Sequence, residues 1–272
     1  MQNTVRTTRA AILLGGKGTR VAPASVIEKC LFPVPGPDGL EPALARHVRI
    51  LRDGAVKETV ALVRRGSPGR RFRELTKSLG FHFRVMPRTT RSLRAAAVRA
   101  LELSDSPLIL ILPDLLPVNS PGLVAKLCRV AGTGSAIAVA RVPAEAARGN
   151  YGIVRVGTRN GRLIGLESLE KPIAIPDRFI DNGHVHAFAG YYLIASELKK
   201  CIMQDRTRGR GEPSMSPAID TCMRAGGLPL VLVAEVLDLG TPATFVTAVN
   251  RLASIEWGQP HVRRAGAEKA ES

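Results

Sequence analysis

The sequence of 272 residues has little of what marks several large protein classes. Aromatic residues make up only 4%, whereas proteins that bind single-stranded nucleic acid usually place stacking aromatic side chains between their cations. No apolar run approaches the ~20 residues of a membrane span, and the apolar stretch near the start is too short for the core of a signal peptide. We therefore expect a cytoplasmic protein without a membrane partner.

Cysteine is also scarce. The four cysteines, Cys30, Cys128, Cys201 and Cys222, form no C-x-x-C pair. Their sequence neighbours are apolar or mixed. Free thiols in a reducing compartment are the simplest interpretation, and a chain of this length can bury enough apolar surface to fold without cross-links.

Acidic residues are too few to balance the basic ones. There are 23 Asp and Glu against 39 Lys and Arg, which gives a formal net charge of +16. Residues 64–99 contain ten Arg and one Lys against the single acid Glu74. Such an excess indicates a polyanionic partner, which could be nucleic acid, an anionic membrane or phosphorylated substrates. The scarcity of aromatics disfavours nucleic acid, although compositional drift on solvated helix faces would also explain the segment.

Short apolar segments alternate with helical patterns along the chain. Strands are predicted at 10–14, 58–63, 81–85, 107–112, 136–141, 151–156, 163–169, 187–194 and 230–236. Helices are predicted at 42–53, 67–79, 92–103, 121–130, 216–225 and 242–253. This alternation predicts an α/β fold, with a mainly parallel, Rossmann-like sheet flanked by helices. Asn160-Gly161 predicts a hairpin turn, so we expect a β-rich insertion in the second half.

A glycine-rich segment, L-G-G-K-G-T-R at residues 14–20, directly follows the first predicted strand. Glycines allow backbone amides to approach phosphate groups, and a cation adds charge. The spacing is neither that of a Walker A loop nor that of G-x-G-x-x-G. A simple tight turn would look the same, so the segment alone does not decide between the two.

Residues 15–34 resemble the signature of the sugar-1-phosphate nucleotidyltransferases. They contain G-G-x-G-T-R, then Pro23, then Lys29 before a short apolar run and Pro33. Further segments match in the order of that family: Leu112-Pro113-Asp114, Tyr151-Gly152-Ile153-Val154, Leu169-Glu170-Lys171-Pro172, Ala189-Gly190-Tyr191-Tyr192, Arg210-Gly211-Glu212 and Leu237-Asp238-Leu239-Gly240-Thr241-Pro242. The resemblance covers about residues 9–253. Within the family, the chain is similar to the glucose-1-phosphate uridylyl- and thymidylyltransferases.

The resemblance implies an enzyme that couples a nucleoside triphosphate to a sugar-1-phosphate and releases pyrophosphate. UTP or dTTP with glucose-1-phosphate are the leading substrates, and Mg²⁺ is the implied cofactor. It also implies a homo-oligomer, either a dimer or a tetramer. We expect a single nucleotidyltransferase domain over 1–257, with a nucleotide-binding part at 9–141, a sugar-phosphate part containing the β-rich insertion at 142–235, and a flexible tail at 258–272.

The resemblance also implies roles for individual residues. Arg20 and Lys29 would be catalytic, stabilising the triphosphate and the leaving pyrophosphate. Asp114 and Asp238 would hold the metal ion. The nucleotide would be bound by Leu14, Gly15, Gly16, Gly18, Thr19 and Ser92. The sugar phosphate would be bound by Tyr151, Gly152, Glu170, Lys171, Tyr191 and Arg210.

Some positions depart from the family pattern. Glu28 stands where the family usually has Pro, and Ser92 replaces a Gly of the nucleobase segment. Leu115-Leu116 is typical of the uridylyl branch and Arg210-Gly211-Glu212 of the thymidylyl branch, so the nucleobase stays open. An alternative function is a non-catalytic regulatory or nucleic-acid-binding protein with the same fold. Arg20, Lys29, Asp114 and Asp238 favour the enzyme.

Overall fold

The computed structural model describes residues 9–14, 31–56, 58–64, 74, 77, 79–80, 82–86, 92–104, 107–204 and 214–258. Its strands are β1 (Arg9–Leu13), β2 (Pro33–Gly36), β3 (Gly39–Pro42), β4 (Glu58–Arg64), β5 (His82–Met86), β6 (Leu108–Ile111), β7 (Leu115–Val118), β8 (Ala136–Pro143), β9 (Ile153–Arg159), β10 (Arg162–Leu169), β11 (His184–Ile194), β12 (Leu228–Val233) and β13 (Glu235–Asp238). Its helices are α1 (Ala43–Asp53), α3 (Leu93–Glu102), α4 (Leu123–Ala131), α5 (Ala144–Ala147), α6 (Ser196–Gln204), α7 (Ser216–Gly226) and α8 (Pro242–Glu256), with the 3-10 turn η2 (Asp177–Phe179).

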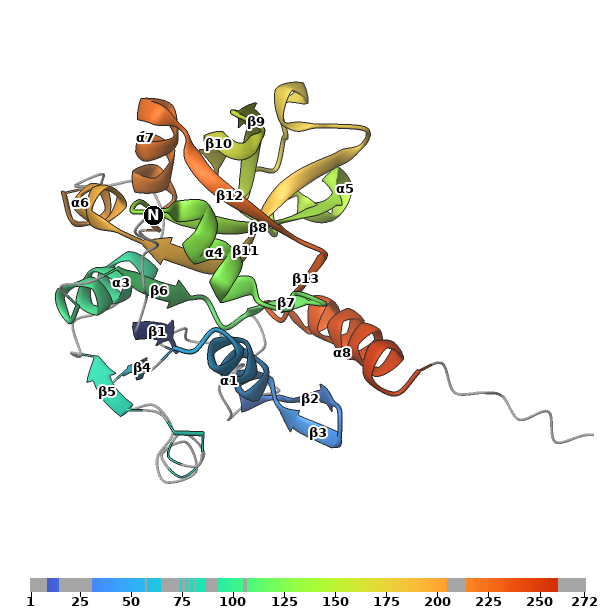
Figure 1. Cartoon of the computed structure of the whole chain (residues 1–272). Helices are drawn as coiled ribbons and strands as arrows, with labels where there is room; N and C mark the ends of the chain where they lie inside the picture. The colour runs from blue at the N-terminus through green and yellow to red at the C-terminus, as the bar shows by residue number, and fades with distance from the viewer. Residues whose placement is uncertain are drawn as a thin grey trace, which may run out of the picture.

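One nine-stranded sheet has the order β5-β4-β1-β6-β11-β8-β12-β10-β9 (Figure 1). Strands β5, β4, β1 and β6 are parallel, in the 3-2-1-4 chain order of a doubly wound sheet. Strand β11 runs antiparallel to both β6 and β8, and β10 is antiparallel to β12 and β9. The predicted parallel pairing is therefore confirmed for β5, β4, β1 and β6 and for β12 with β8, while the other neighbours in the second half are antiparallel. The direction of β11 was not predictable, because a long buried apolar run is equally typical of a parallel and an antiparallel central strand.

Helices cover both faces of this sheet (Figure 1). Ile12 of β1 packs in one cluster with apolar residues of α1, α4 and α5, while Leu13 packs in a second cluster with those of α3, α6 and α7. The two neighbours divide in this way because successive side chains of a strand point to opposite faces. The result is a three-layer α/β/α arrangement, in agreement with the predicted α/β class.

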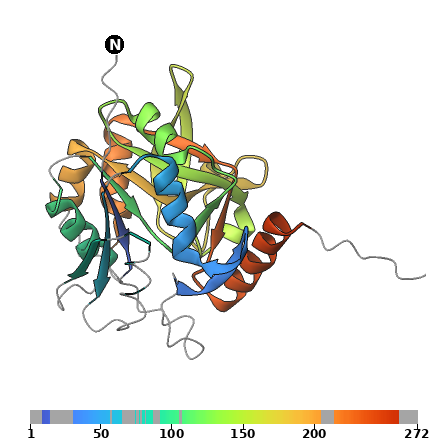
Figure 2. The same cartoon turned by 60° about the horizontal axis from the view of Figure 1, so that its bottom comes forward.

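A smaller lobe extends from one end of the sheet. Helix α8 packs against the β2–β3 hairpin and against the two-stranded β7–β13 ladder, as Figure 2 shows for the hairpin. Val34, Leu116, Leu237 and Leu252 are core residues of this lobe. The sequence predicted α8 but neither β2, β3 nor β7. A single strand was predicted at 230–236, but the chain bends there and continues as β12 and then β13.

The second half continues the same sheet. The predicted hairpin is confirmed as β9 and β10, with Asn160 and Gly161 at φ of 51° and 71°. Both parts of the predicted domain contribute strands to one sheet, and the proposed division between them stays a prediction. Residues 259–272 of the predicted tail lie outside the described part, as do residues 65–73 and 87–91 of the basic segment.

The described part contains no helix long and apolar enough to span a membrane. Within that part, Cys201 on α6 and Cys222 on α7 form no disulfide, and their Sγ atoms lie 2.7 Å apart. Cys30 lies outside the described residues. The predicted cellular location and oligomeric state stay predictions.

Candidate active site

A cavity of about 220 Å³ lies at the carboxyl ends of β1 and β6. In the doubly wound half of the sheet this is the point where the strand order reverses, and ligands of such sheets bind there. The cavity is lined by Leu13, Leu14, Leu93, Leu112, Pro113, Asp114, Leu115, Asn150, Tyr151, Gly152, Glu170, Lys171, Phe188, Tyr192, Met215, Ser216, Ile219 and Asp238. Six of the predicted site residues are therefore brought to one cavity, together with Leu14 at its β1 edge.

The two predicted metal ligands meet through a short backbone ladder. Strand β7 begins directly after Asp114 and pairs antiparallel with β13, so that Leu115 lies opposite Asp238. The Leu239 N–H donates to the Asp114 carbonyl oxygen at 2.8 Å, which extends the pairing beyond the strands. The Asp238 carboxylate is 9% exposed, and its Oδ1 accepts the Gly240 N–H at 2.6 Å. A Cβ at Gly240 would lie 2.6 Å from that oxygen, so a side chain there would displace the carboxylate.

Both carboxylates act electrostatically on the cavity. The pKa of the Tyr151 hydroxyl is raised by burial first and then by the charges of Asp238 and Asp114. Burial likewise raises the pKa of Tyr192, with contributions from Glu170 and Asp114. Both phenols therefore stay protonated and can donate hydrogen bonds into the cavity.

The donor set fits a hard divalent cation that is completed by substrate. Within the described ranges, no group of three or more His, Cys, Asp or Glu side chains is arranged to hold a metal ion. Mg²⁺ is usually bound through only one or two carboxylates, with water molecules and substrate phosphates as the other ligands. Asp114 and Asp238 match that requirement. His184 and His186, which the sequence places two residues apart, belong to no such group.

A second wall of the cavity is formed by Tyr151 and Gly152, just before β9, and by Glu170 and Lys171, just after β10. A Cβ at Gly152 would lie 2.8 Å from Cδ2 of Phe188, so glycine lets this backbone lie against the aromatic ring. Lys171 has φ of +40°, an unusual backbone conformation for a residue with a side chain. The Ser216 hydroxyl donates to the Glu170 carboxylate and thereby ties this wall to the start of α7.

One predicted contact residue, Tyr191, is wrong. Its side chain is fully buried and faces away from the cavity, whereas the next residue, Tyr192, lines it. The reason is the alternation of side chains along β11, where Phe188 and Tyr192 share the cavity face with ring centroids 5.9 Å apart. The family resemblance indicated the correct segment but the wrong tyrosine.

Tyr191 instead supports the segment that carries Asp114. Its hydroxyl lies 2.7 Å from Nδ1 of His47, whose Nε2 lies 3.2 Å from the Pro113 carbonyl oxygen. Burial lowers the pKa of His47 to about 4, so the ring is neutral and carries one N–H. Because a carbonyl can only accept, we assign that hydrogen to Nε2 and let Nδ1 accept from Tyr191. This polar chain holds the backbone one residue before Asp114.

Ser92 is not among the residues that line the cavity. Its Oγ accepts the Ala95 N–H at 3.1 Å and caps α3, while the next residue, Leu93, reaches the cavity. Nucleotide binding by Ser92 stays a prediction. The predicted residues Gly15, Gly16, Gly18, Thr19, Arg20, Lys29 and Arg210 lie outside the described part of the chain.

The sequence missed several residues of the cavity. Asn150 adjoins the predicted Tyr151, and Tyr192 was detectable from strand alternation once one neighbour was assigned. Ser216 carried no such signal, because a serine at the start of a helix is usually only a cap. Its contact with Glu170 joins segments 46 residues apart and depends on the tertiary fold.

A known domain family matches most of the chain. The sequence model of the MobA-like NTP transferase domain family matches residues 10–239. No curated protein sequence gives a significant match.

Solved structures share the fold at low sequence identity. UDP-glucose pyrophosphorylase complexed with UDP-glucose is 16% identical with a TM-score of 0.72, and the match covers 92% of this chain and 99% of that one. A putative glucose-1-phosphate thymidylyltransferase from Bacillus anthracis is 19% identical with a TM-score of 0.71, covering 90% and 94%. UTP-bound UGPase from Acinetobacter baumannii is 17% identical with a TM-score of 0.69, covering 92% and 94%.

The TM-scores show a common fold, and the family match covers most of the chain. The nucleotidyltransferase family predicted from residues 15–34 and the later motifs is thus confirmed. The chain belongs to the family of MobA-like NTP transferase domains.

Proposed function

We propose that the protein transfers a nucleotidyl group from a nucleoside triphosphate to a sugar-1-phosphate. The observation that carries this proposal is the composition of the cavity at the switch point of the sheet. It combines Asp114 and Asp238 on one wall with Glu170 and Lys171 on the other. A carboxylate pair and a separate cation in one cavity suit two anionic substrates that must be brought together.

In the proposed reaction a phosphate oxygen of the sugar-1-phosphate attacks the α-phosphorus of the triphosphate. The bond from the α-phosphorus to the oxygen bridging to the β-phosphorus breaks, and pyrophosphate leaves with that electron pair. The protein supplies positioning and charge compensation, since both reactants already carry the reacting groups.

Asp114 and Asp238 would hold the Mg²⁺ ion. When bound, that ion neutralises phosphate charge between the two substrates. The carboxylate pair is ready for this role because the β7–β13 ladder and the Gly240 amide fix its backbone and one oxygen. Leu14 lines the cavity at the end of β1, which supports the proposal that the glycine segment after it binds the nucleotide. Arg20 and Lys29 remain the proposed catalytic cations.

On the other wall, Lys171 would bind the sugar phosphate through its ammonium group, together with Arg210. Glu170 would accept hydrogen bonds from sugar hydroxyls, and Tyr151 and Tyr192 would donate them. Their raised pKa keeps both tyrosines protonated at neutral pH. Tyr192 takes the place that the sequence assigned to Tyr191.

The leading substrates are UTP or dTTP with glucose-1-phosphate. Leu115-Leu116 after Asp114 supports the uridylyl branch, and two structures with this fold are named as UDP-glucose pyrophosphorylase with UDP-glucose and as UTP-bound UGPase. Arg210-Gly211-Glu212 supports the thymidylyl branch, as does the fold shared with a putative thymidylyltransferase.

A substrate matrix tests the proposal. Pyrophosphate release is measured for each common nucleoside triphosphate against a panel of sugar-1-phosphates, with and without Mg²⁺. We expect release with one pair or a few related pairs, dependent on both substrates. No release from any pair, together with tight and steeply salt-dependent binding to DNA or RNA, would overturn it in favour of a nucleic-acid-binding protein.

A further inference from the structure

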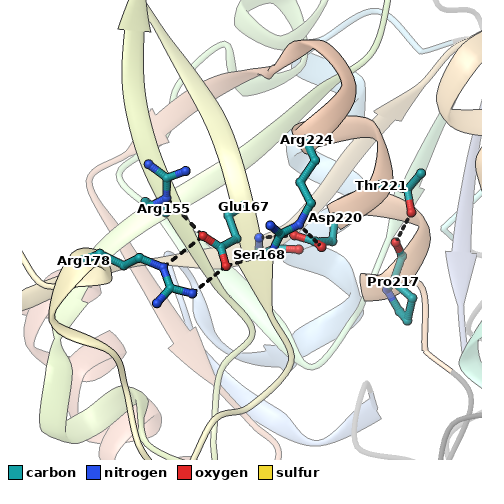
Figure 3. Close-up of polar contacts among 8 residues, drawn as sticks. All are labelled: Arg155, Glu167, Ser168, Arg178, Pro217, Asp220, Thr221 and Arg224. Carbon is teal, nitrogen blue, oxygen red and sulfur yellow. Dashed lines mark hydrogen bonds and ion pairs between the residues drawn. The ribbon is translucent and has the colours of Figure 1, made fainter.

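A buried carboxylate outside the cavity joins three separate elements. Glu167 of β10 is 5% exposed and accepts hydrogen bonds from three arginines, as Figure 3 shows. Arg178 of η2 donates from Nε at 3.1 Å and from Nη2 at 2.8 Å. Arg224 of α7 donates at 2.7 Å, and Arg155 of β9 donates at 3.2 Å. A buried carboxylate with three charged donors is a strong anchor, because its charge is fully compensated.

Helix α7 contacts the end of β10 in a regular register. Ser216, Asp220 and Arg224 are spaced by four residues and so share one face of the helix. In that order they bond to the Glu170 carboxylate, the Ser168 N–H and the Glu167 carboxylate. The Ser168 N–H donates to Asp220 Oδ1 at 2.7 Å, while Asp220 Oδ2 accepts from Arg224 Nε at 2.6 Å. We call these three helix residues, with Glu167, the α7 clamp.

The segment that the clamp holds leads directly into Glu170 and Lys171. With Tyr151 and Gly152, these residues form the proposed sugar-binding wall of the cavity, which we call the sugar wall. Glu170 and Lys171 follow β10, and Arg178 closes the segment from its far end by bonding back to Glu167. Midway, the Gly149 N–H donates to the Pro172 carbonyl oxygen at 3.0 Å. Lys171 has its unusual φ of +40° inside this closed segment. Such a conformation persists only when the surrounding structure fixes it.

We infer that Asp220 and Glu167 are positioning residues that hold Glu170 and Lys171 in the geometry needed to bind the sugar phosphate. The inference rests on the proposed function and extends it to residues outside the cavity, since neither side chain lines it. Asp220 acts through the Ser168 amide and Glu167 through Arg178 and Arg224. None of the hydrogen bonds given above for the clamp involves Asp114 or Asp238, so we expect the effect to fall on the sugar phosphate rather than on the triphosphate.

Four variants of α7 separate positioning from general stability. Asp220→Ala removes the acceptor for the Ser168 amide, whereas Asp220→Asn keeps a carbonyl oxygen in that place. Thr221→Ala is the matched control: its hydroxyl donates to the Pro217 carbonyl oxygen at 2.9 Å, on a side of α7 away from β10 (Figure 3). Arg224→Ala, at a side chain 55% exposed, is a second variant that should fold if Asp220→Ala does not.

We expect Asp220→Ala to raise KM for the sugar-1-phosphate about ten-fold, the size of one lost charged hydrogen bond, with KM for the triphosphate unchanged. Asp220→Asn should restore most of the loss, Arg224→Ala should shift the same KM in the same direction, and Thr221→Ala should match the wild type. Hydrogen exchange at Ser168–Lys171 should be faster in Asp220→Ala than in Thr221→Ala.

A folded Asp220→Ala protein with wild-type KM for the sugar-1-phosphate overturns the inference, as does an equal rise in both KM values. If the wild type releases no pyrophosphate from any substrate pair, the proposed function is contradicted but the structural role of the clamp is not. Hydrogen exchange then still decides on the clamp: an unchanged rate at Ser168–Lys171 in Asp220→Ala overturns it, and a faster rate supports it.

Discussion

The two walls of the cavity are held in different ways. Asp114 and Asp238 are fixed by backbone pairing between β7 and β13 and by an apolar core that includes Leu116 and Leu237. Glu170 and Lys171 lie beyond the end of β10, where Glu170 accepts from Ser216 and the nearby Glu167 pairs with Arg178 and Arg224, both more than half exposed. We therefore expect the proposed metal-ligand wall, Asp114 and Asp238, to depend on packing, and the proposed sugar wall, Glu170 and Lys171, to depend on electrostatics.

This difference suits the two proposed tasks. Two like charges near each other repel, and a rigid backbone ladder can hold them until a cation binds. A wall that binds one particular sugar can instead be adjusted by changing side chains on α7 while the sheet stays the same. The contrast predicts that the two walls respond differently to substitution and to pH.

The largest effect is expected at the metal-ligand wall. Asp114→Asn and Asp238→Asn keep the shape of each side chain but remove its charge. We expect each to lower kcat/KM by at least ~100-fold at a fixed Mg²⁺ concentration, since the ion contributes several kcal/mol to charge stabilisation. Glu102→Gln, which removes an exposed charge on α3, is the control. Near-normal turnover in Asp114→Asn would end the metal assignment.

The next effect is a loss of folding stability at low pH that comes from the metal-ligand wall. His47 lies behind the metal-ligand wall with its pKa lowered from 6.5 to about 4. Above pH 6.5 the ring is neutral in both the folded and unfolded states. As pH falls from 6.5 to about 4, the unfolded chain takes up a proton that the folded chain does not, so folding stability falls. The shift corresponds to about 3 kcal/mol.

Urea unfolding of the wild type and His47→Gln at pH 7 and pH 4.5 measures this contribution. The wild type should lose more unfolding free energy between the two pH values than the variant does. Equal losses would show that His47 does not carry the expected pH dependence.

A third effect tests the close packing of the sugar wall. Gly152→Ala would place a Cβ 2.8 Å from Cδ2 of the buried Phe188, so the backbone of this wall must move. We expect a loss of about 1–3 kcal/mol in unfolding free energy, the usual range for overpacking, with a higher KM for the sugar-1-phosphate. Gly134→Ala, where the nearest atom is 3.5 Å away, is the control. A wild-type KM in a stable Gly152→Ala protein would contradict the assignment of this wall.

The smallest effect concerns the clamp at low pH. Hydrogen bonds from Arg178 first, and from Arg224 and Arg155, lower the pKa of Glu167 to about 2 against the opposing effect of burial. Glu167 therefore adds stability that is fully present above its ordinary pKa of 4.5 and is lost as pH falls toward 2. The stability difference between wild type and Glu167→Gln should be constant above pH 4.5 and shrink below it. If the stability difference instead shrinks between pH 6.5 and 4.5, a group other than Glu167 causes the pH dependence.

Much of this arrangement was predictable from local patterns. Buried apolar runs followed by polar residues indicated β1 and β6, and Asn160-Gly161 fixed the β9–β10 turn. Asp114 and Asp238 were assigned through motif resemblance, and the structure brings them to one cavity. Strands β2 and β7 were missed because both contain proline, which usually argues against a strand. Both lie in two-stranded ladders, where one side of each strand needs no partner.

The clamp was not predictable, for a physical reason. Glu167, Arg178 and Arg224 look like ordinary surface charges in the sequence, and their pairing depends on how α7 packs against β10. The antiparallel direction of β11 also follows from tertiary pairing. The sugar wall, built from such long-range side-chain contacts, was therefore less visible in the sequence than the metal-ligand wall.

The central proposal is that both walls serve one transfer reaction. The direct measurement is ³¹P NMR of the wild-type protein with Mg²⁺, a nucleoside triphosphate and a sugar-1-phosphate, across the substrate matrix. We expect one pyrophosphate for each nucleoside diphosphate sugar formed, with both substrates consumed equally. Inorganic phosphate and nucleoside diphosphate as the products, or no consumption of the sugar-1-phosphate with any triphosphate, would contradict the proposal.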